Sequence, residues 1–420
     1  MRILTCRGVW RSPAQAGDEH RPVCSKSRPE LTAQVKVGRV LGCGEVDEQQ
    51  QKDTGVKVVS IVGTRPEAVK MAPVLAELAR YGDVDSRLLV TAQHREMLDQ
   101  VLDIFGITPA YDLDLMRPDQ TPTQVLASAI QGLSGVLDEF APDWVLVQGD
   151  TTTALAGALV TAYRKGCRLA HVEAGLRTYD FDNPFPEELN RVLIDHACDL
   201  LFAPTRRAQE ALLREGLPPA TIHVTGNTVI DALQFMSSRL DAIGGAAEIP
   251  QGKRLVLVTT HRRESHGAPI RDIFSALRQL AERDDVHLLY PVHPNPNVSG
   301  PAWELLGDHP HISLVAPLDY LSFVRLMSQA YLILTDSGGV QEEAPSLGVP
   351  VLVLRATTER QEALEAGVAK LVGVDTTTIV REATLLLDDP TARARMVGAV
   401  NPFGDGTAAR QIVHILRHMA

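Results

Sequence analysis

The chain has 420 residues, of which 45% are hydrophobic and 22% charged, and its formal net charge is −11. This composition is typical of a globular protein of about two domains, and the acidic balance argues against nucleic acid as a partner, because nucleic-acid binders present a basic surface. The sequence contains no apolar run of about 18 residues, so neither a transmembrane helix nor a membrane partner is expected. The cysteines form none of the short zinc spacings and are expected to be reduced in a cytoplasmic protein: Cys6, Cys24, Cys43, Cys167 and Cys198.

Residues 1–55 differ from the rest of the chain. They mix Arg, Pro, Gly and Gln without a lasting periodicity, and they lack the apolar core of a signal peptide. We expect a disordered N-terminal extension, or a start codon assigned too far upstream, and we assign this segment no function.

From Val56 onward, short apolar runs alternate with amphipathic helices. The runs are almost continuous in Val, Leu and Ile, which predicts strands buried on both faces of parallel sheets. Strands are expected in the first half at 56–63, 87–91, 144–148, 168–173, 200–204 and 222–226. In the second half they are expected at 254–260, 286–292, 312–315, 331–335 and 349–355, and helices are expected at, for example, 67–80, 124–139 and 270–283.

Two consecutive arrays of this kind predict an α/β protein with two doubly wound, Rossmann-like domains. The boundary is expected near residues 230–252, where a helical pattern runs into a Gly- and Ala-rich stretch. A ligand would bind in the cleft between the domains, at the carboxyl ends of the strands.

Four acidic residues follow two neighbouring predicted strands, and they are the strongest indication of catalysis. They are Asp150, Glu173, Glu187 and Glu188, and carboxylates around one cleft can move protons on and off a substrate. Asp150 could instead cap a helix, and Glu173 could form an ion pair with Arg177. The Pro186 that precedes Glu187 suggests that a loop, rather than a helix surface, presents this acid.

Two glycine turns are suited to holding a diphosphate. The first predicted strand ends at Gly63, which would let the turn approach a ligand and would place Arg65 and Lys70 at the cleft. In the second half, Ser337-Gly-Gly339 follows an apolar strand and opens a helix whose N–H groups could bind phosphate. Neither turn matches the dinucleotide or P-loop fingerprints, so NAD binding and ATP hydrolysis are unsupported. Solvated surface charges and an empty glycine turn are the alternatives.

His261 and His293 each follow a predicted strand and could contact phosphate or transfer protons. They could also be zinc ligands together with Glu173 and Asp150. Because the chain has no HExxH sequence and no cysteine partner for them, we predict no metal site.

Taken together, these segments resemble one family. Gly63-Thr-Arg-Pro-Glu-Ala68, Gly149-Asp-Thr-Thr-Thr153, His171-Val-Glu-Ala-Gly-Leu-Arg-Thr178, His261-Arg-Arg-Glu264 and Asp336-Ser-Gly-Gly339 are similar to the motifs of the UDP-N-acetylglucosamine 2-epimerases. The resemblance runs from about Val56 to the C-terminus. It implies a glycosyltransferase-B-like fold whose C-terminal helix crosses back to the first domain, with domains at 56–229 plus 404–420 and at 230–403. It also implies a homodimer and no cofactor.

The resemblance further assigns roles to individual residues. The catalytic residues would be Asp150, Glu173, Glu187 and His261, and the substrate-binding residues would be Arg65, Lys70, Phe323, Ser337, Gly338, Gly339, Glu343 and Arg360. Glu343 would hold the ribose and Phe323 would flank the uracil. Gln93, His94 and Glu96 lie where bacterial members bind a second UDP-GlcNAc as an allosteric activator.

The implied activity is the non-hydrolysing interconversion of UDP-GlcNAc and UDP-ManNAc. Because no carbonyl acidifies the C2 proton, the reaction would proceed by anti-elimination of UDP to a 2-acetamidoglucal and syn re-addition. A hydrolysing epimerase, a glycosyltransferase of the same fold and a UDP-sugar sensor remain alternatives. Departures from the family pattern at Thr260, Leu318, Ala356 and Gln361 also leave open a modified GlcNAc as the substrate.

Overall fold

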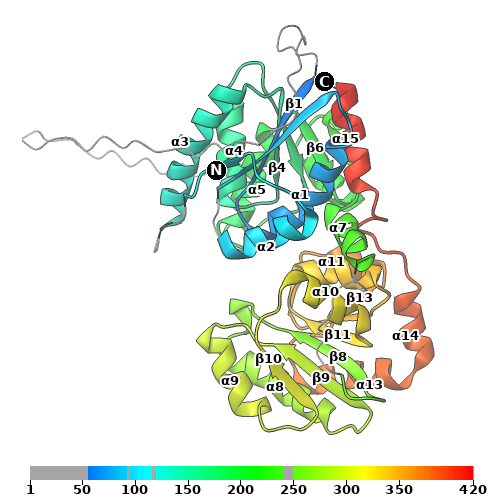
Figure 1. The fold of residues 1–420 in the computed structure, drawn as a ribbon. Coiled ribbons are helices and arrows are strands. Elements are labelled where there is room, and N and C mark those ends of the chain that lie inside the picture. Colours follow the sequence, from blue (N-terminus) through cyan, green and yellow to red (C-terminus); the bar gives the residue numbers. More distant parts are fainter. Residues whose placement is uncertain (1–54, 92–94, 116, 118–119, 240–248, 420) are drawn as a thin grey trace, which may run out of the picture. The chain divides into compact units, whose positions relative to one another are not determined.

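The computed structural model describes residues 55–91, 95–115, 117, 120–239 and 249–419. Within these residues lie two parallel sheets, one of seven and one of six strands, each flanked by helices (Figure 1). The predicted class, α/β with two doubly wound Rossmann-like arrays, is confirmed.

The first sheet has the order β3-β2-β1-β4-β5-β6-β7, and all of its pairs are parallel. Its strands are β1 Val56–Val62, β2 Val84–Val90, β3 Tyr111–Asp112, β4 Trp144–Gln148, β5 Arg168–Val172, β6 Leu200–Ala203 and β7 Ile222–Val224. Its helices are α1 Arg65–Leu78, α2 Arg95–Phe105, α3 Pro122–Phe140, α4 Thr152–Ala162, α5 Glu187–Ala197, α6 Arg206–Arg214 and α7 Thr228–Ser237, with a short 3₁₀ turn at Pro219–Thr221.

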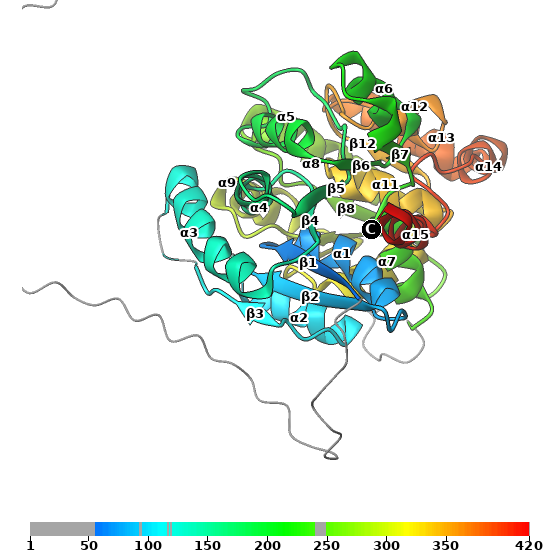
Figure 2. The same ribbon diagram turned by 90° about the horizontal axis from the view of Figure 1, so that it is seen from above.

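Both faces of this sheet are buried, which explains why its strands are apolar without alternation. Val58 and Val62 pack on one face with residues of α1, α2 and α15 (Ala408–Met419), whereas Val59 and Ile61 pack on the other with residues of α3 and α4. Figure 2 shows α3 and α4 on one side of β1 and β4, and α1, α7 and α15 on the other.

The second sheet has the order β10-β9-β8-β11-β12-β13 and is likewise parallel throughout. Its strands are β8 Arg254–Thr259, β9 Val286–Pro291, β10 Ile312–Val315, β11 Leu332–Thr335, β12 Val351–Val353 and β13 Ala369–Leu371. Its helices are α8 Ala268–Ala281, α9 Pro296–Leu306, α10 Tyr320–Gln329, α11 Gly338–Ser346, α12 Gln361–Glu365, α13 Thr376–Asp388 and α14 Pro390–Val397, with a 3₁₀ turn at Arg263–Ser265. Helices α8, α9 and α13 cover one face, and α7, α10 and α11 cover the other.

The last helix, α15, packs against the first sheet, although it follows the second sheet in the sequence. Ile412, Val413 and Leu416 are buried in the same cluster as Val58 of β1, and the Asp231 carboxylate of α7 accepts hydrogen bonds from the first turn of α15. The domain limits 56–229 plus 404–420 and 230–403 remain a prediction. No helix in the described part of the chain is long and apolar enough to cross a membrane.

Candidate active site

The turn between β1 and α1 is held by a buried glutamate. Glu67 Oε2 accepts the N–H groups of Gly63 at 3.1 Å and Thr64 at 2.6 Å, and Oε1 accepts the hydroxyl of Thr151 at 2.8 Å. Burial raises the pKa of Glu67 to about 7. A Cβ atom at Gly63 would lie 2.4 Å from Thr153 Oγ1, so the close approach that this glycine allows is to α4 rather than to a ligand.

Glu173 lies at the centre of a buried polar cluster just after β5. Its Oε2 atom accepts hydrogen bonds from Lys70 Nζ, from Gln148 Nε2 at 2.9 Å and from Asn227 Nδ2 at 3.2 Å. Among the described residues no donor reaches Oε1. Burial acts to raise the pKa of Glu173, but Lys70 and Arg360 outweigh it and hold the pKa below the ordinary value of 4.5. The carboxylate is therefore ionised and held by one oxygen.

The backbone of Glu173 has a φ of +74°, a left-handed conformation that is uncommon for residues other than glycine and that concentrates at functional sites. The ion pair with Arg177 that the sequence suggested does not form; Arg177 pairs with Asp195 and Glu215 instead.

The cluster continues into the second half of the chain through Glu342, which the sequence analysis did not select. Asn227 Nδ2 lies 2.6 Å from Glu342 Oε2, and Arg360 Nε lies 2.7 Å from Glu342 Oε1. Burial raises the pKa of Glu342. The predicted residues Lys70, Glu173 and Arg360 are therefore brought together, and Asn227 and Glu342 connect them.

Asp150 follows β4 and is anchored by a residue of α5. Its Oδ2 atom pairs with Arg191, and its carbonyl accepts a hydrogen bond from Asn190 Nδ2 at 2.9 Å. It does not cap α4, because Thr151 does so by accepting the N–H of Ala154 at 3.0 Å. The Asp150 side chain remains 31% exposed, so it can be reached from solvent.

Glu187 and Glu188 are neighbours in sequence but differ in their surroundings. Glu188 is fully buried, and its Oε1 atom accepts the N–H groups of Thr178 and Tyr179 at 3.0 and 2.8 Å. Glu187 is half-buried and has no hydrogen-bond partner among the described residues. It is the first residue of α5, so the expectation that a loop rather than a helix presents it is corrected: the preceding Pro186 is the helix N-cap.

His261 follows β8 and is held over the second sheet by Asp336. The Asp336 Oδ2 atom accepts the His261 N–H at 2.8 Å, and Oδ1 lies 3.2 Å from His261 Nδ1. The ring stacks on His293 with 5.8 Å between centroids. Burial, and then the proximity of His261, lowers the pKa of His293. His261 is 40% exposed, which leaves its ring open to a ligand.

The helix α11 begins at Gly338, directly after Ser337, so its first N–H groups have no intrahelical acceptor. A Cβ atom at Gly338 would lie 3.0 Å from Glu359 Oε1 and 3.4 Å from Arg360 Cζ. The glycine therefore lets Glu359 and Arg360 lie beside the helix N-terminus, and Arg360 is paired there with both Glu342 and Glu359.

One turn further along α11, Glu343 is buried and accepts a hydrogen bond from the Tyr320 hydroxyl at 2.6 Å. Burial raises the pKa of Glu343 to about 7, and the charge of Arg65 acts in the opposite direction. Arg65, from α1, is thus close enough to influence a carboxyl of the second half. Phe323 of α10 is half-buried and packs against the hydrophobic core on the face of the second sheet that α7, α10 and α11 cover.

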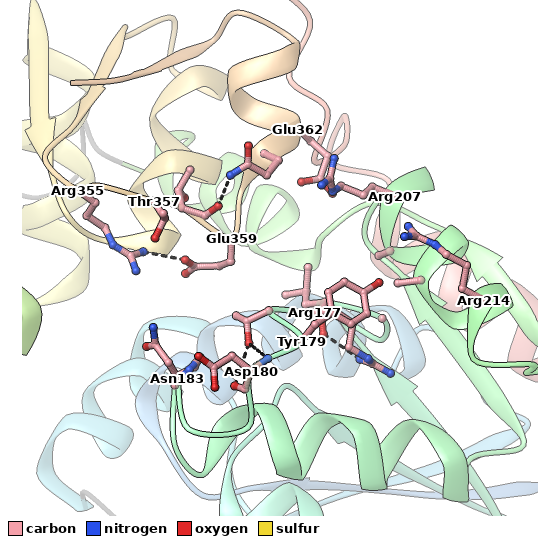
Figure 3. Close-up of a pocket in the computed structure, with 18 of the residues that line it drawn as sticks. Arg177, Tyr179, Asp180, Asn183, Arg207, Arg214, Arg355, Thr357, Glu359 and Glu362 are labelled. Atoms are coloured by element: carbon pink, nitrogen blue, oxygen red, sulfur yellow. Dashed lines mark hydrogen bonds and ion pairs between the residues drawn. The ribbon is translucent and has the colours of Figure 1, made fainter. Parts of the chain in front are cut away.

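One cavity lies beside these residues rather than on them (Figure 3). Its volume is about 460 Å³. The walls come from the segment after β5, from α6 and from the segment after β12: Thr178, Tyr179, Asn183, Arg207, Arg214, Arg262, Arg355, Thr357 and Glu359 are among them. None of the predicted site residues lines it, but Arg262 and Glu359 adjoin His261 and Arg360 in sequence.

Two further predictions concern metals and the activator. Within the described part of the chain, no group of three or more His, Cys, Asp and Glu side chains is arranged to hold a metal ion. Gln93 and His94 lie outside the described residues, and so does the side chain of Glu96, so the activator site stays a prediction.

The carboxylates at the ends of β4 and β5, together with the glycine helix start and the buried acid of α11, are features of an enzyme built on two Rossmann-like sheets. Comparison with known proteins makes this specific. A family model described as UDP-N-acetylglucosamine 2-epimerase matches residues 76–417, and the UDP-N-acetylglucosamine 2-epimerase of Yersinia pestis is 50% identical over 372 residues, covering 86% of this chain and 99% of that protein. The chain belongs to the UDP-N-acetylglucosamine 2-epimerase family, and it is an epimerase.

Solved structures of similar proteins agree with this family assignment. The UDP-GlcNAc 2-epimerase of Neisseria meningitidis bound to UDP-GlcNAc superimposes with a TM-score of 0.81 at 45% identity, covering 86% of this chain and all of that one. The complex of Staphylococcus aureus MnaA with UDP gives a TM-score of 0.78 at 44% identity, with 87% and 97% coverage.

Proposed function

We propose that this chain interconverts UDP-GlcNAc and UDP-ManNAc without net hydrolysis. One carboxylate takes the C2 proton while the bond between C1 and the UDP oxygen breaks, which gives a 2-acetamidoglucal and UDP. A proton then returns to C2 on the opposite face, and the UDP oxygen adds back to C1. The proton and the UDP lost in the first step are both regained, so no cofactor is required.

The observation that carries the proposal is the environment of Glu173. Three donors converge on its Oε2 atom. Its backbone φ of +74° is strained for a residue other than glycine, and it lies in the turn at the end of β5. An ionised carboxylate with one oxygen anchored and the other free is suited to accepting a proton from a bound substrate. Asp150 and Glu187, on adjoining segments, would complete the acid–base set.

The leaving diphosphate needs positive charge and N–H donors, because charge develops on its oxygen as the C1–O bond breaks. Arg65 and Lys70 are proposed to supply the positive charge and His261 a ring nitrogen. The N–H groups of Gly338 and Gly339 and the hydroxyl of Ser337 would supply the donors, since the Ser337 N–H already donates to Thr335 Oγ1. Lys70 now pairs with Glu173, so substrate phosphate would compete for this ammonium group. The UDP-GlcNAc bound in the N. meningitidis relative supports the same class of ligand here.

Three further proposals rest on the resemblance to the family: a homodimeric state, a cytoplasmic location and activation by a second UDP-GlcNAc near Gln93 and His94. A hydrolysing reaction is the second candidate, since water could trap the same glucal. The side chains of Lys70 and Glu173 are only 14% and 7% exposed, and Asn227 and Glu342 are buried. This enclosure favours the non-hydrolysing course, because it limits the access of water.

Proton NMR of the purified protein with UDP-GlcNAc in D2O tests the proposal. We expect deuterium at C2, a new UDP-ManNAc anomeric signal and no free sugar. Free ManNAc with UDP would instead establish the hydrolysing reaction, and an unchanged spectrum would refute both. Glu173→Gln should abolish the exchange at C2, whereas Glu304→Gln, in an exposed ion pair with Arg271, should leave it unchanged.

A further inference from the structure

A buried histidine lies beneath the turns that carry the predicted carboxylates. His171, in β5, is fully buried. Its Nε2 atom lies 2.8 Å from the carbonyl oxygen of Gly149, and its Nδ1 atom lies 2.5 Å from Asp195 Oδ1. Since neither ring edge reaches solvent, the histidine cannot contact substrate, and any effect on catalysis must act through these two partners.

Asp195 links His171 to two further groups. Its Oδ2 atom accepts the N–H of Gly175 at 3.1 Å and lies 2.7 Å from Arg177 Nη1. The remaining nitrogens of Arg177 bind both oxygens of Glu215, at 2.7 and 2.8 Å. Both carboxylates of the network are thus matched by a base, as buried charges must be.

Hydrogen-bond chemistry defines the state of the ring. A carbonyl oxygen cannot donate, so Nε2 must carry a proton to bond Gly149. Asp195 Oδ2 accepts the N–H of Gly175 and pairs with the guanidinium of Arg177, so Asp195 is a carboxylate and Nδ1 must also donate. The ring therefore carries two N–H groups, and the network contains two cations and two anions.

The network touches all three segments that bear the predicted carboxylates. Gly149 immediately precedes Asp150, and Gly175 lies two residues after Glu173. Asp195 is in α5, the helix that begins at Glu187. We propose that His171 is a positioning residue: its two N–H groups join the turns after β4 and β5 to α5 and so set the relative positions of Asp150, Glu173 and Glu187. The inference rests on the proposed epimerase activity.

Two substitutions separate the links. In His171→Asn the amide nitrogen takes the place of Nδ1, which keeps a donor to Asp195 and removes the bond to Gly149. In His171→Gln the amide nitrogen takes the place of Nε2, which keeps the hydrogen bond to the Gly149 carbonyl and removes the one to Asp195. His287→Asn is the matched control, since His287 is also a strand histidine, 4% exposed, and the change removes the bond of its Nε2 atom, which lies 2.9 Å from Ser313 Oγ in the second sheet.

We expect kcat to fall by about 10–100-fold in each His171 variant, because small misplacements of reacting groups cost this much. The KM for UDP-GlcNAc and the Kd for UDP should stay within about threefold of the wild type, because most groups proposed to bind the nucleotide, such as Phe323, Gly338 and Glu343, lie in the second half. Exchange of the C2 proton in D2O should fall in parallel with kcat. His287→Asn, which removes a buried histidine's bond to Ser313, should lower the thermal unfolding temperature but leave kcat unchanged.

Histidine-labelled ¹⁵N NMR of the wild type provides a readout that a purely structural role would not move. We expect two directly bonded protons on the His171 ring at neutral pH, with the assignment made by the loss of these signals in His171→Gln. A single ring N–H, or kcat values in both His171 variants within threefold of the wild type, would overturn the proposal. A wild type that does not epimerise would instead refute the proposed function, and the NMR result would remain independent of it.

Discussion

Replacing Glu343 by Gln should make the protein more stable at alkaline pH and weaken its binding of UDP. Glu343 is buried in α11, where its Oε1 atom accepts the Tyr320 hydroxyl at 2.6 Å. Burial raises its pKa to about 7, so the carboxyl binds its proton more tightly in the folded protein than in the unfolded chain. The stability that this proton provides is complete below pH 4.5 and is lost as the pH rises through about 7.

The magnitude follows from the two pKa values. The folded value of about 7 and the ordinary value of 4.5 differ by an amount worth about 3 kcal/mol of unfolding free energy at pH 8, at about 1.4 kcal/mol for each pH unit. A glutamine at position 343 has no proton to lose, and its amide oxygen can still accept the Tyr320 hydroxyl. The variant should therefore be more stable than the wild type by up to about 3 kcal/mol at pH 8 and by little at pH 5.

Binding should change in the opposite direction. A carboxylate that accepts ribose hydroxyls contributes about 1.5–3 kcal/mol, so Glu343→Gln should bind UDP at least about 10-fold more weakly at pH 8. In the wild type the Kd for UDP should also improve as the pH rises through about 7, and this extra dependence should vanish in the variant. Comparing the two proteins at each pH cancels the titration of UDP itself.

Urea unfolding and isothermal titration calorimetry between pH 5 and 8.5 measure both quantities. Asp231→Asn is the matched control: burial raises the Asp231 pKa to about 6, but its hydrogen bonds go to α15, so it should change the pH dependence of stability and not the Kd for UDP. Parallel stability profiles for wild type and Glu343→Gln would show that Glu343 titrates normally, and an unchanged Kd would remove it from the ribose site.

Two more substitutions test the packing around the carboxylates. Asn227→Ala removes the amide between Glu173 and Glu342 and should lower the unfolding free energy in urea by about 1–3 kcal/mol, because a buried acceptor loses its donor; a cost below about 0.5 kcal/mol would mean that water replaces the amide. Gly63→Ala should cost about 1–3 kcal/mol, because the new Cβ atom would lie 2.4 Å from Thr153 Oγ1, and adding Thr153→Ala should recover most of it unless the turn itself is strained.

The strands were predictable because burial on both faces leaves a simple signal. The expected strand at 144–148 coincides with β4, and the expected ends of β1, β5 and β8 lie one residue from the observed ends. The two strands that were missed, β3 and β13, have only two and three residues. They form sheet edges, and so short a run carries no periodicity that could be recognised in the sequence.

Only those site residues that follow a predicted strand could be placed from the sequence. Both Lys70 and Glu173 follow strands of one sheet, and they do meet. Glu342 could not be chosen over the adjacent Glu343 from sequence, since which of two neighbouring acids meets Asn227 depends on how α11 is rotated. The pairing of Asn227 with Glu342 spans 115 positions of the chain, and no local pattern encodes a contact at that range.

The three predicted carboxylates are held in three different ways, and this difference suggests how the work is divided between them. Glu173 is anchored by three donors and Asp150 by Arg191, whereas Glu187 has no hydrogen-bond partner among the described residues. An anchored, ionised carboxylate can accept a proton without moving, but it has none to give until it has taken one. Roles of acid and base are set by such contrasts in surroundings. We therefore expect Glu173 to receive the C2 proton of one epimer, and the proton for the opposite face to come from a group that solvent can recharge, for which half-buried Glu187 is the best placed of the three.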